Sequence, residues 1–319
     1  MKFSSTLLSY LVTSSLAANV RTVYQFSNPT WLENIAAMRN GSLLVTVIGR
    51  PEVHLVDPHV QPSTSSLIAS FPNTNAVLGI SEISDNVFAV AAGNTTPANA
   101  PVLGTYGIWK IDLSQKKSKF QKIADLPNVD MVNGIVKLND HTLLMADSWA
   151  GNIVTLNTRT GAYRVALSDA SLASNFSVPA LPLGVNGIKI HNGYLYYSNT
   201  VQARLGRVRI SPTGEPTGPF TTLASVPQIS VPDDFAVAKD GSVYLTGPLA
   251  APQGDTLQHI TLDGKIETVA KGGAVVGATA ATFGRTRTDR NTVYLSTMGG
   301  FGSDGVPLAG GRVVAVSLD

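Results

Sequence analysis

One pattern of two short strands around a turn returns along the whole chain. Its clearest copy is NGIKIHNGYLYYSN at residues 186–199, in which an apolar run, an Asn192-Gly193 corner and an alternating run predict a β-hairpin. Equivalent runs occur at Asn34–Thr46, Leu78–Val90, Asn133–Ala146, Asp234–Thr246 and Ala281–Ser296. These six copies, spaced by roughly 45 to 55 residues, are typical of propeller blades rather than of solenoid turns.

Further short strands are expected after each copy. Third strands are expected at 53–56, 107–111, 152–156, 206–210, 257–261 and 311–317, and fourth strands at 67–71, 120–124, 163–167, 220–224 and 266–270. The last copy lacks a fourth strand before Asp319, whereas Thr22–Phe26 has the pattern of one. We therefore expect an all-β, six-bladed propeller in which the N-terminal strand Val20–Phe26 pairs with Arg312–Ser317 and closes the ring.

The composition agrees with one closed domain at residues 19–319. The chain has 319 residues, of which 44% are hydrophobic, with 29 Gly and 18 Pro, and this suits many short strands and turns. A net charge of +2, with no basic run beyond Lys116-Lys117, gives no electrostatic case for nucleic acid as a partner.

Residues Met1–Ala18 have the pattern of a secretory signal peptide. Lys2 supplies the positive start, 7–12 a short apolar core and 15–18 a small-residue cleavage site, while the apolar stretch is too short for a stable membrane anchor. Acceptor patterns for N-glycans at Asn40, Asn94 and Asn175 fit this route to the secretory pathway. The chain has 0 Cys, so its stability owes nothing to disulfides.

Blade topology places the long loops on one face of the expected propeller. Turns between first and second strands, such as Asn139-Asp140-His141, are short and polar. The loops on the other face are long and mostly apolar, and they span 93–106, 174–185, 247–255 and 299–310. Function is expected on these long loops, which a rigid scaffold holds in place.

Four blades place similar residues where their innermost strands begin. If the blades superpose, these side chains converge on the central channel, and they are Glu33, Asn133, Asn186 and Asp233. Two carboxylates and two amide oxygens form an all-oxygen set that suits a hard cation such as calcium. The alternative interpretation is that Asn before Gly only shapes the start of the strand.

The NGI-type strand starts and the PDD motif at 232–234 resemble the six-bladed propellers that include gluconolactonases, senescence-marker lactonases, paraoxonases and strictosidine synthases. In the lactonases of this superfamily the matching Glu, Asn, Asn and Asp bind one divalent cation. Asp234 stands where paraoxonases place Asn, a departure that changes the charge of the site. The resemblance implies a metal-dependent lactonase as one function.

A narrower resemblance covers nearly the whole chain after the leader. VYQFSNPTWLENIAAMRNGSLLVT, MVNGIV, LMADSWAGNI, GVNGIKI and PDDFAV are similar to the fungal hetero-Diels-Alderases of tropolone-sesquiterpenoid biosynthesis. The family implies dehydration of a benzylic-type alcohol to an ortho-quinone methide, which adds across an alkene of a humulene-type sesquiterpene. No organic cofactor is implied, and the expected partners are small apolar substrates.

Such a cycloaddition needs an apolar enclosure and hydrogen bonds to the oxygen on which charge grows. Loop residues expected to enclose the substrates are Trp31, Trp149, Phe176, Leu249 and Phe301, although each could instead anchor its loop. Expected hydrogen-bond donors are Asn133, Asn186, Asn199 and Arg204, and expected acids or bases are Glu33, Asp233 and Asp234.

Other motifs exclude some functions. Gly300–Gly305 matches a dinucleotide fingerprint in letters, but no helix is expected after it. The five His residues fall in turns or on third strands, so a Ser-His-Asp hydrolase is disfavoured. A pericyclase is the favoured function, with a metal-dependent lactonase and a non-catalytic secreted binding propeller as alternatives.

Overall fold

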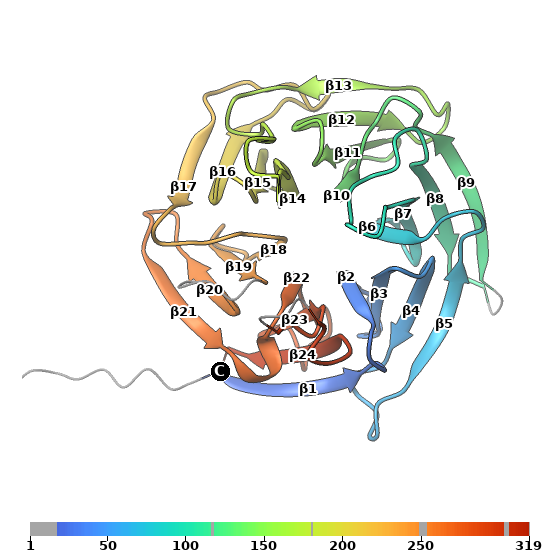
Figure 1. Ribbon diagram of the computed structural model, residues 1–319, viewed down its shortest axis with the longest axis vertical. Helices are drawn as coiled ribbons and strands as arrows, with labels where there is room; N and C mark the ends of the chain where they lie inside the picture. Colours follow the sequence, from blue (N-terminus) through green and yellow to red (C-terminus); the bar gives the residue numbers. More distant parts are fainter. Residues whose placement is uncertain (1–17, 116–117, 180, 249–253, 303–305, 319) are drawn as a thin grey trace, which may run out of the picture.

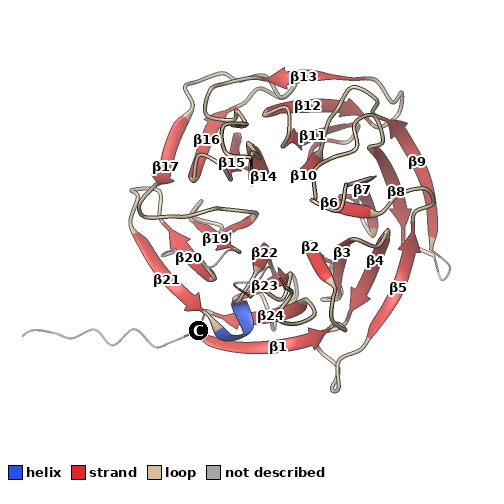
Figure 2. Ribbon diagram, viewed as in Figure 1, coloured by secondary structure: helices blue, strands red, loops and turns tan. Residues whose placement is uncertain are grey.

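The computed structural model describes residues 18–115, 118–179, 181–248, 254–302 and 306–318. The expected leader, apart from Ala18, and the expected substrate contact Leu249 lie outside the described residues. Within them the one helix is a short 3-10 turn, η1 (Gly273–Val275), drawn in blue among the red strands of Figure 2. No helix in this part of the chain is long and apolar enough to cross a membrane.

Strands make up the regular structure, and each expected strand is present within about three residues of its expected bounds. Their bounds are β1 (Asn19–Gln25), β2 (Trp31–Ala37), β3 (Leu43–Ile48), β4 (Glu52–Val56), β5 (Ser65–Ser70), β6 (Ala76–Ser84), β7 (Val87–Gly93), β8 (Gly107–Asp112), β9 (Lys119–Asp125), β10 (Val132–Asn139), β11 (Thr142–Asp147), β12 (Asn152–Asn157), β13 (Tyr163–Leu167), β14 (Val185–His191), β15 (Tyr194–Asn199), β16 (Arg204–Arg209), β17 (Thr221–Ser225), β18 (Phe235–Val237), β19 (Val243–Gly247), β20 (Thr256–Ile260), β21 (Ile266–Lys271), β22 (Ala278–Phe283), β23 (Thr292–Thr297) and β24 (Arg312–Ser317).

The strands form small antiparallel sheets. Three sheets are four-stranded meanders in chain order, β10–β13, β14–β17 and β18–β21. A fourth has the order β1-β24-β23-β22, with β1 running antiparallel to β24. In the remaining eight-stranded sheet, β2–β5 and β6–β9 are joined through one residue pair, Ile48 opposite Ala76. Figure 1 shows a propeller-like arrangement around a central axis, with β2, β6, β10, β14, β18 and β22 innermost.

The core lies between neighbouring sheets. Second strands such as β3 (LLVTVI) are buried at nearly every position, whereas the outer strand β9 (KFQKIAD) is largely exposed. One core cluster joins Leu78 and Ala89 of the eight-stranded sheet to Val132 and Met145 of the next sheet. Each such Leu or Val contributes about 1.5 to 3 kcal/mol through burial, so packing between sheets stabilises the fold without disulfides.

Three side-chain hydroxyls near the axis donate to carbonyls of the next group of strands around it. Thr46 Oγ1 donates to the carbonyl of Leu78 at 2.7 Å, and Ser198 Oγ donates to the carbonyl of Asp233. Between the last sheet and β2, Thr279 Oγ1 donates to the carbonyl of Leu32 at 2.9 Å. These bonds satisfy carbonyls that face the narrow interior of the ring.

Glycines allow the innermost strands to approach one another closely. A Cβ atom on Gly134 would lie 2.5 Å from the carbonyl oxygen of Asn186. A Cβ on Gly79 would overlap the carbonyl oxygen of Asn133, and one on Gly187 would overlap the Asp234 carboxylate. The Gly of the NG motif is therefore required by the neighbouring sheet, not only by the shape of the strand's own start.

Candidate active site

Three candidate site residues lie on β-bulges of the innermost strands. At each bulge two residues oppose one residue of the second strand, and the first of the two is Glu33 in β2, Asn133 in β10 and Asn186 in β14. A bulge re-aims a side chain, and here it turns all three toward the axis. Asp233 holds the matching place just before β18, where its N–H donates to the carbonyl of Thr246 at 3.1 Å.

At two of these bulges, hydroxyl side chains satisfy backbone N–H groups that the bulge leaves unpaired. Asn34 N donates to Thr46 Oγ1 at 2.9 Å, and Gly187 N donates to Ser198 Oγ at 2.8 Å. The same hydroxyls donate to the carbonyls of Leu78 in β6 and of Asp233 before β18, so one side chain fixes both a bulge and the next group of strands. The positions of the candidate residues are therefore set by the scaffold rather than by mobile loops.

Glu33, Asn133, Asn186 and Asp233 line one central cavity of about 420 Å³. They form its polar floor, while the walls are mainly apolar and include Trp31, Met131, Trp149, Leu183, Val231 and Met298. The structure thus brings together the residues that the sequence placed in register. It also adds Met131, Leu183 and Met298, which the sequence did not single out because isolated apolar loop residues carry no distinguishing pattern.

Glu33 is an almost fully buried carboxyl group, with 6% of its surface exposed. Trp31 Nε1 donates to Glu33 Oε2 at 2.9 Å, and Asn133 Nδ2 donates to Glu33 Oε1 at 3.4 Å. Burial raises the pKa of Glu33 to about 7, because desolvation and the charge of Asp234 outweigh these two hydrogen bonds. Glu33 can therefore exist as acid or carboxylate near neutral pH.

Asp233 and Asp234 are neighbours with different roles. Burial, followed by the negative charges of Glu33 and Asp234, raises the pKa of Asp233 well above its usual range. Asp234 does not line the cavity, and its carboxylate binds Lys189 Nζ at 2.5 and 2.6 Å. The expected acid–base role of Asp234 is therefore not supported, because a lysine already holds its charge.

Asn186 lines the cavity with an acceptor oxygen that has no protein partner. The Thr200 hydroxyl donates to the carbonyl of Pro232 at 2.9 Å, so it must accept the bond of 3.0 Å from Asn186 Nδ2. Asn186 Oδ1 is left buried without a protein partner. The amide N–H groups of Asn186 are engaged by Thr200 and by the carboxylate of Asp233, whose pKa the second bond lowers, whereas Asn133 keeps a second N–H beyond its bond to Glu33.

The floor fits a hard divalent cation. Among the described residues no three acidic, His or Cys side chains gather as a metal cluster, so any site here must combine the two acids with amide oxygens. The unpartnered Asn186 Oδ1 and the two carboxyls of raised pKa supply oxygen ligands that calcium prefers. Glu33, Asn133, Asn186 and Asp233 would hold such an ion.

Trp149 is held at the cavity wall by a rigid turn. The Asp147 carboxylate accepts bonds from the N–H groups of Met131 at 3.0 Å and Ala150 at 3.1 Å, which fixes the turn on both sides of the indole. Trp149 contacts Phe176 edge to face, with ring centroids 5.2 Å apart. Trp149 therefore occupies the position expected for a substrate contact, and Phe176 supports it from the exposed side.

Besides Phe176, three expected substrate contacts among the described residues lie outside the central cavity. Both N–H groups of the Asn199 amide are used, at 3.0 Å, by the carbonyls of Ser171 and Ala173. Arg204 Nη1 donates to Thr222 on the outer strand β17. Neither residue lines the cavity, because the side chain of Asn199 is used to hold a loop and Arg204 faces the outer strand. Phe301 lines an adjoining cavity and contacts Trp31, with centroids 5.6 Å apart.

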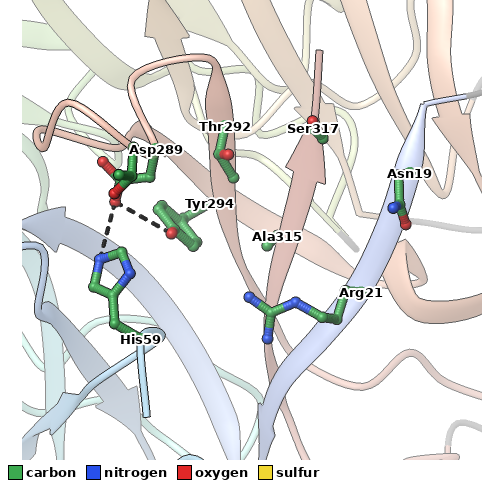
Figure 3. Close-up of a pocket in the computed structure, with 9 residues that line it drawn as sticks. Asn19, Arg21, His59, Asp289, Thr292, Tyr294, Ala315 and Ser317 are labelled. Carbon is green, nitrogen blue, oxygen red and sulfur yellow. Dashed lines mark hydrogen bonds and ion pairs between the residues drawn. The ribbon is translucent and has the colours of Figure 1, made fainter. Parts of the chain in front are cut away.

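A different polar cluster lies by the β4–β5 and β22–β23 connections, on the face that blade topology places opposite the long loops. Figure 3 shows His59, Asp289 and Tyr294 around a cavity of about 240 Å³. His59 Nε2 lies 3.3 Å from Asp289 Oδ2, and Tyr294 Oη donates to the same oxygen at 3.2 Å. Thr286 N and Oγ1 donate to Asp289 Oδ1 at 2.7 and 2.6 Å. Both carboxylate oxygens are satisfied, which is typical of a structural contact between sheets.

Comparisons with known proteins agree on fold and relatives. No family model matches the chain. It is 26% identical over 308 residues to a putative hetero-Diels-Alderase of Phoma sp., with 86% of each chain covered. It is 25% identical to the putative hetero-Diels-Alderase asR5 of Sarocladium schorii, covering 86% of this chain and 77% of the relative.

The fold has a matching relative among solved structures. A calcium-binding protein, regucalcin, of Agrobacterium tumefaciens aligns with a TM-score of 0.63 at 15% identity, covering 94% of this chain and 95% of that one. At this identity the likeness concerns the fold alone. The expected resemblance is confirmed: this chain is similar over most of its length to proteins named hetero-Diels-Alderases, on a propeller-like fold shared with regucalcin.

Proposed function

We propose that this protein is a pericyclase of secondary metabolism, and the observation that carries the proposal is the central cavity. Its walls are apolar, and its floor holds two carboxyls of raised pKa beside two amides. Such a site can hold two apolar partners in near-attack geometry, which contributes on the order of 7 to 11 kcal/mol without a nucleophile. The relatives named putative hetero-Diels-Alderases support the same reaction class.

The proposed reaction begins with loss of water from a hydroxylated tropolone. One protonated carboxyl of the Glu33–Asp233 pair gives its proton to the departing hydroxyl, and the other, as carboxylate, accepts the proton of the ring hydroxyl. One water leaves and an ortho-quinone methide remains. Its oxygen and exocyclic carbon then add across an alkene of a humulene-type sesquiterpene. One C–O and one C–C bond form, and no further proton moves.

Other residues position the partners in this proposal. Trp149 and Met131 enclose the tropolone, and the second N–H of Asn133 donates to the oxygen on which charge grows. Asn186 Oδ1 accepts a hydrogen bond from the tropolone. No organic cofactor enters this reaction. A calcium ion on the floor, when bound, supplies charge to orient oxygen atoms of the substrate.

The test incubates purified protein with a hydroxylated tropolone precursor and humulene, and compares rate and isomer ratio with the uncatalysed mixture. We expect a faster reaction that yields one major isomer. Trp149→Ala should lower the rate and the isomer ratio together, because the wall that orients the tropolone is lost. An unchanged rate and isomer distribution would contradict the proposal.

A metal-dependent lactonase is the second candidate. The buried, unpartnered Asn186 Oδ1 favours it, because this oxygen together with the two carboxyls can hold a divalent cation that polarises a lactone carbonyl. Turnover of simple aldonolactones that is lost after chelation, with no effect on the cycloaddition, would favour this candidate over the pericyclase.

We also infer a six-bladed ring whose last blade is completed by β1. In this interpretation the eight-stranded sheet counts as two blades, and the pairing of β1 with β24 supports the closure. Deleting residues 20–26 should expose the edge of β24 and cause a large loss of thermal stability with aggregation. A truncated protein that melts at the wild-type temperature would contradict this architecture.

The leader and glycans complete the proposal. Residues 1–18 are proposed to direct the chain into the secretory pathway and to be removed there. Asn40 and Asn175 are exposed, whereas Asn94 is partly buried and its Nδ2 donates to the carbonyl of Asn73 at 3.1 Å. Because glycans attach at Nδ2, we expect them on Asn40 and Asn175 and little on Asn94. Mass spectrometry of glycopeptides from secreted protein tests this order.

A further inference from the structure

A second cavity adjoins the central cavity. This side cavity has a volume of about 430 Å³, and its lining includes Phe301, Pro29, Pro97 and Pro307. Four residues line both cavities and form a shared wall, and they are Trp31, Ile48, Asn99 and Met298. Each volume lies within the range of small-molecule sites. The two spaces therefore form neighbouring compartments on one face of the ring.

The chemistry of the two compartments differs. All four floor residues, and with them both carboxyls of raised pKa, lie in the central cavity. Among the described residues that line the side cavity there is no Asp or Glu. Its polar side chains include Thr30, Arg50 and Asn99. Arg50 Nη2 donates to Thr30 Oγ1 at 3.1 Å, Arg50 Nε pairs with Glu52 Oε2 at 3.4 Å, and Thr30 Oγ1 donates to the carbonyl of Ser27 at 2.6 Å.

We propose that the side cavity binds the hydrocarbon alkene partner, while the oxygen-bearing partner occupies the central cavity. This inference rests on the proposed function. A hydrocarbon gains free energy from apolar walls and offers no hydrogen bond to the central floor, where buried polar groups would be left unpaired. The oxygen-bearing partner has the opposite preference. Each compartment therefore selects one of the two reactants.

Trp31 is the residue that links the compartments. Its ring contacts Phe301 on the side-cavity wall, and its Nε1 donates to Glu33 Oε2 on the central floor. One indole thus packs against the hydrocarbon and orients the carboxyl that serves the other reactant. In this proposal the double bond of the hydrocarbon meets the quinone methide beside this indole, because Trp31 is one of the four residues that line both cavities.

The experiment measures binding of each reactant alone to the full mature chain, by calorimetry and by quenching of tryptophan fluorescence. Phe301→Ala removes an aromatic wall of the side cavity, and Trp149→Ala removes one of the central cavity. We expect Phe301→Ala to weaken humulene binding about tenfold or more and to leave binding of the hydroxylated tropolone unchanged. Trp149→Ala should show the reverse.

Two further variants distinguish a specific loss of binding in the side cavity from general damage to the loop that contains Phe301. Leu308→Ala changes a residue of the same loop that is 64% exposed and does not line either cavity, and it should bind both compounds normally. If Phe301→Ala folds poorly, Phe301→Leu replaces it in the experiment. Phe301→Leu keeps an apolar wall and should retain most of the humulene affinity.

The outcomes distinguish this inference from the proposed function. Humulene binding that depends on Phe301 but yields no adduct with the tropolone supports the apolar compartment while contradicting the pericyclase. Catalysis in which Phe301→Ala alters the apparent KM of both reactants equally, or of neither, overturns the division into two compartments while the pericyclase stands. Competition between humulene and the tropolone for one site would also overturn it.

Discussion

The central cavity and the Asp289 cluster on the opposite face both bury a carboxyl group where neighbouring sheets meet, yet they differ in how that group is satisfied. Asp289 accepts bonds from Thr286 and Tyr294 and contacts His59. In the central cavity Glu33 and Asp233 have raised pKa values, and Asn186 Oδ1 has no protein partner. One cluster is complete without a ligand, and the other is not.

This difference indicates which of the two buried carboxyl clusters is the functional site. A buried carboxylate with all its partners stabilises the fold, whereas buried polar groups left unpaired cost stability and persist where a substrate, proton or ion completes them. The Tyr294 hydroxyl belongs to the fully partnered cluster. Burial and the charge of Asp289 raise the pKa of Tyr294, so its hydroxyl stays a hydrogen-bond donor. Changes to the two regions should therefore have opposite consequences.

The largest expected effect is on catalysis. Glu33→Gln should lower kcat about 10²- to 10⁴-fold, because the amide cannot exchange a proton with the substrate, and it should leave the protein at least as stable as wild type. Product formation and urea unfolding measure the two quantities. Asp140→Asn, on the opposite face with 85% of its side chain exposed, is the matched control. A Glu33→Gln protein with wild-type kcat would remove Glu33 from the proposed chemistry.

Asp289→Ala should have the complementary effect. We expect it to lower the free energy of unfolding by about 3 kcal/mol, because the Thr286 and Tyr294 donors are left buried without an acceptor. The rate per folded molecule should not change. Urea unfolding and active-site titration measure these quantities, and a lost rate in a fully folded variant would show that the two regions do not differ as we infer.

Calcium should raise the stability of the protein by binding in the central cavity and not at the Asp289 cluster. At pH 8 an ion at 100 times its Kd would raise the free energy of unfolding by about 2.7 kcal/mol. Asp233→Ala should abolish this gain, whereas Asp140→Asn should keep it. Calorimetric melting and elemental analysis of protein purified without chelator provide the readouts. The absence of stoichiometric metal, together with no shift in melting, would leave the floor residues as hydrogen-bonding groups and favour the pericyclase over the lactonase.

The smallest effect expected is a pH dependence without calcium. Because burial raises the pKa of Glu33 from 4.5 to about 7, the native protein holds a proton that the unfolded chain has released between these values. The contribution of Glu33 to the free energy of unfolding is therefore fully present below pH 4.5. It falls as the pH rises toward 7, by up to about 1.4 kcal/mol per pH unit. Urea unfolding at pH 5.5 and 6.5 measures it. Glu33→Gln should reduce the slope and leave the part that comes from Asp233, whose pKa is also raised. An unchanged slope in this variant would assign all of it to another group.

Much of the fold was predictable because local patterns repeat. Alternating or continuous apolar runs bounded by Gly and Asn turns predicted the strands, and the register of the repeat predicted that Glu33, Asn133, Asn186 and Asp233 would share one location. The bulges were not predictable in the same way. Whether two residues oppose one depends on the partner strand, here through Thr46 and Ser198, and the strand's own letters do not record it.

Three predicted site residues that do not line the central cavity have one physical feature in common. Asn199, Arg204 and Asp234 have the chemical groups that a site needs, but each binds a protein partner outside the central cavity. Asn199 donates to the carbonyls of Ser171 and Ala173, Arg204 Nη1 donates to Thr222, and Asp234 binds Lys189. A sequence shows which groups a side chain carries. It does not show which partners, distant in the chain, have already engaged them.

The sequence by itself determined that this chain forms small antiparallel sheets in a repeating order, and which polar residues stand at equivalent places. Those properties follow from local backbone preferences and from the burial of alternate side chains along each strand. The tertiary structure decided which of these residues remain available. The arrangement of the sheets around an axis buried Glu33 and raised its pKa, oriented Asn186 through Thr200, and formed the side cavity from loops far apart in the chain. Desolvation and hydrogen-bond partnership depend on neighbours in space, so only the folded ring could set them.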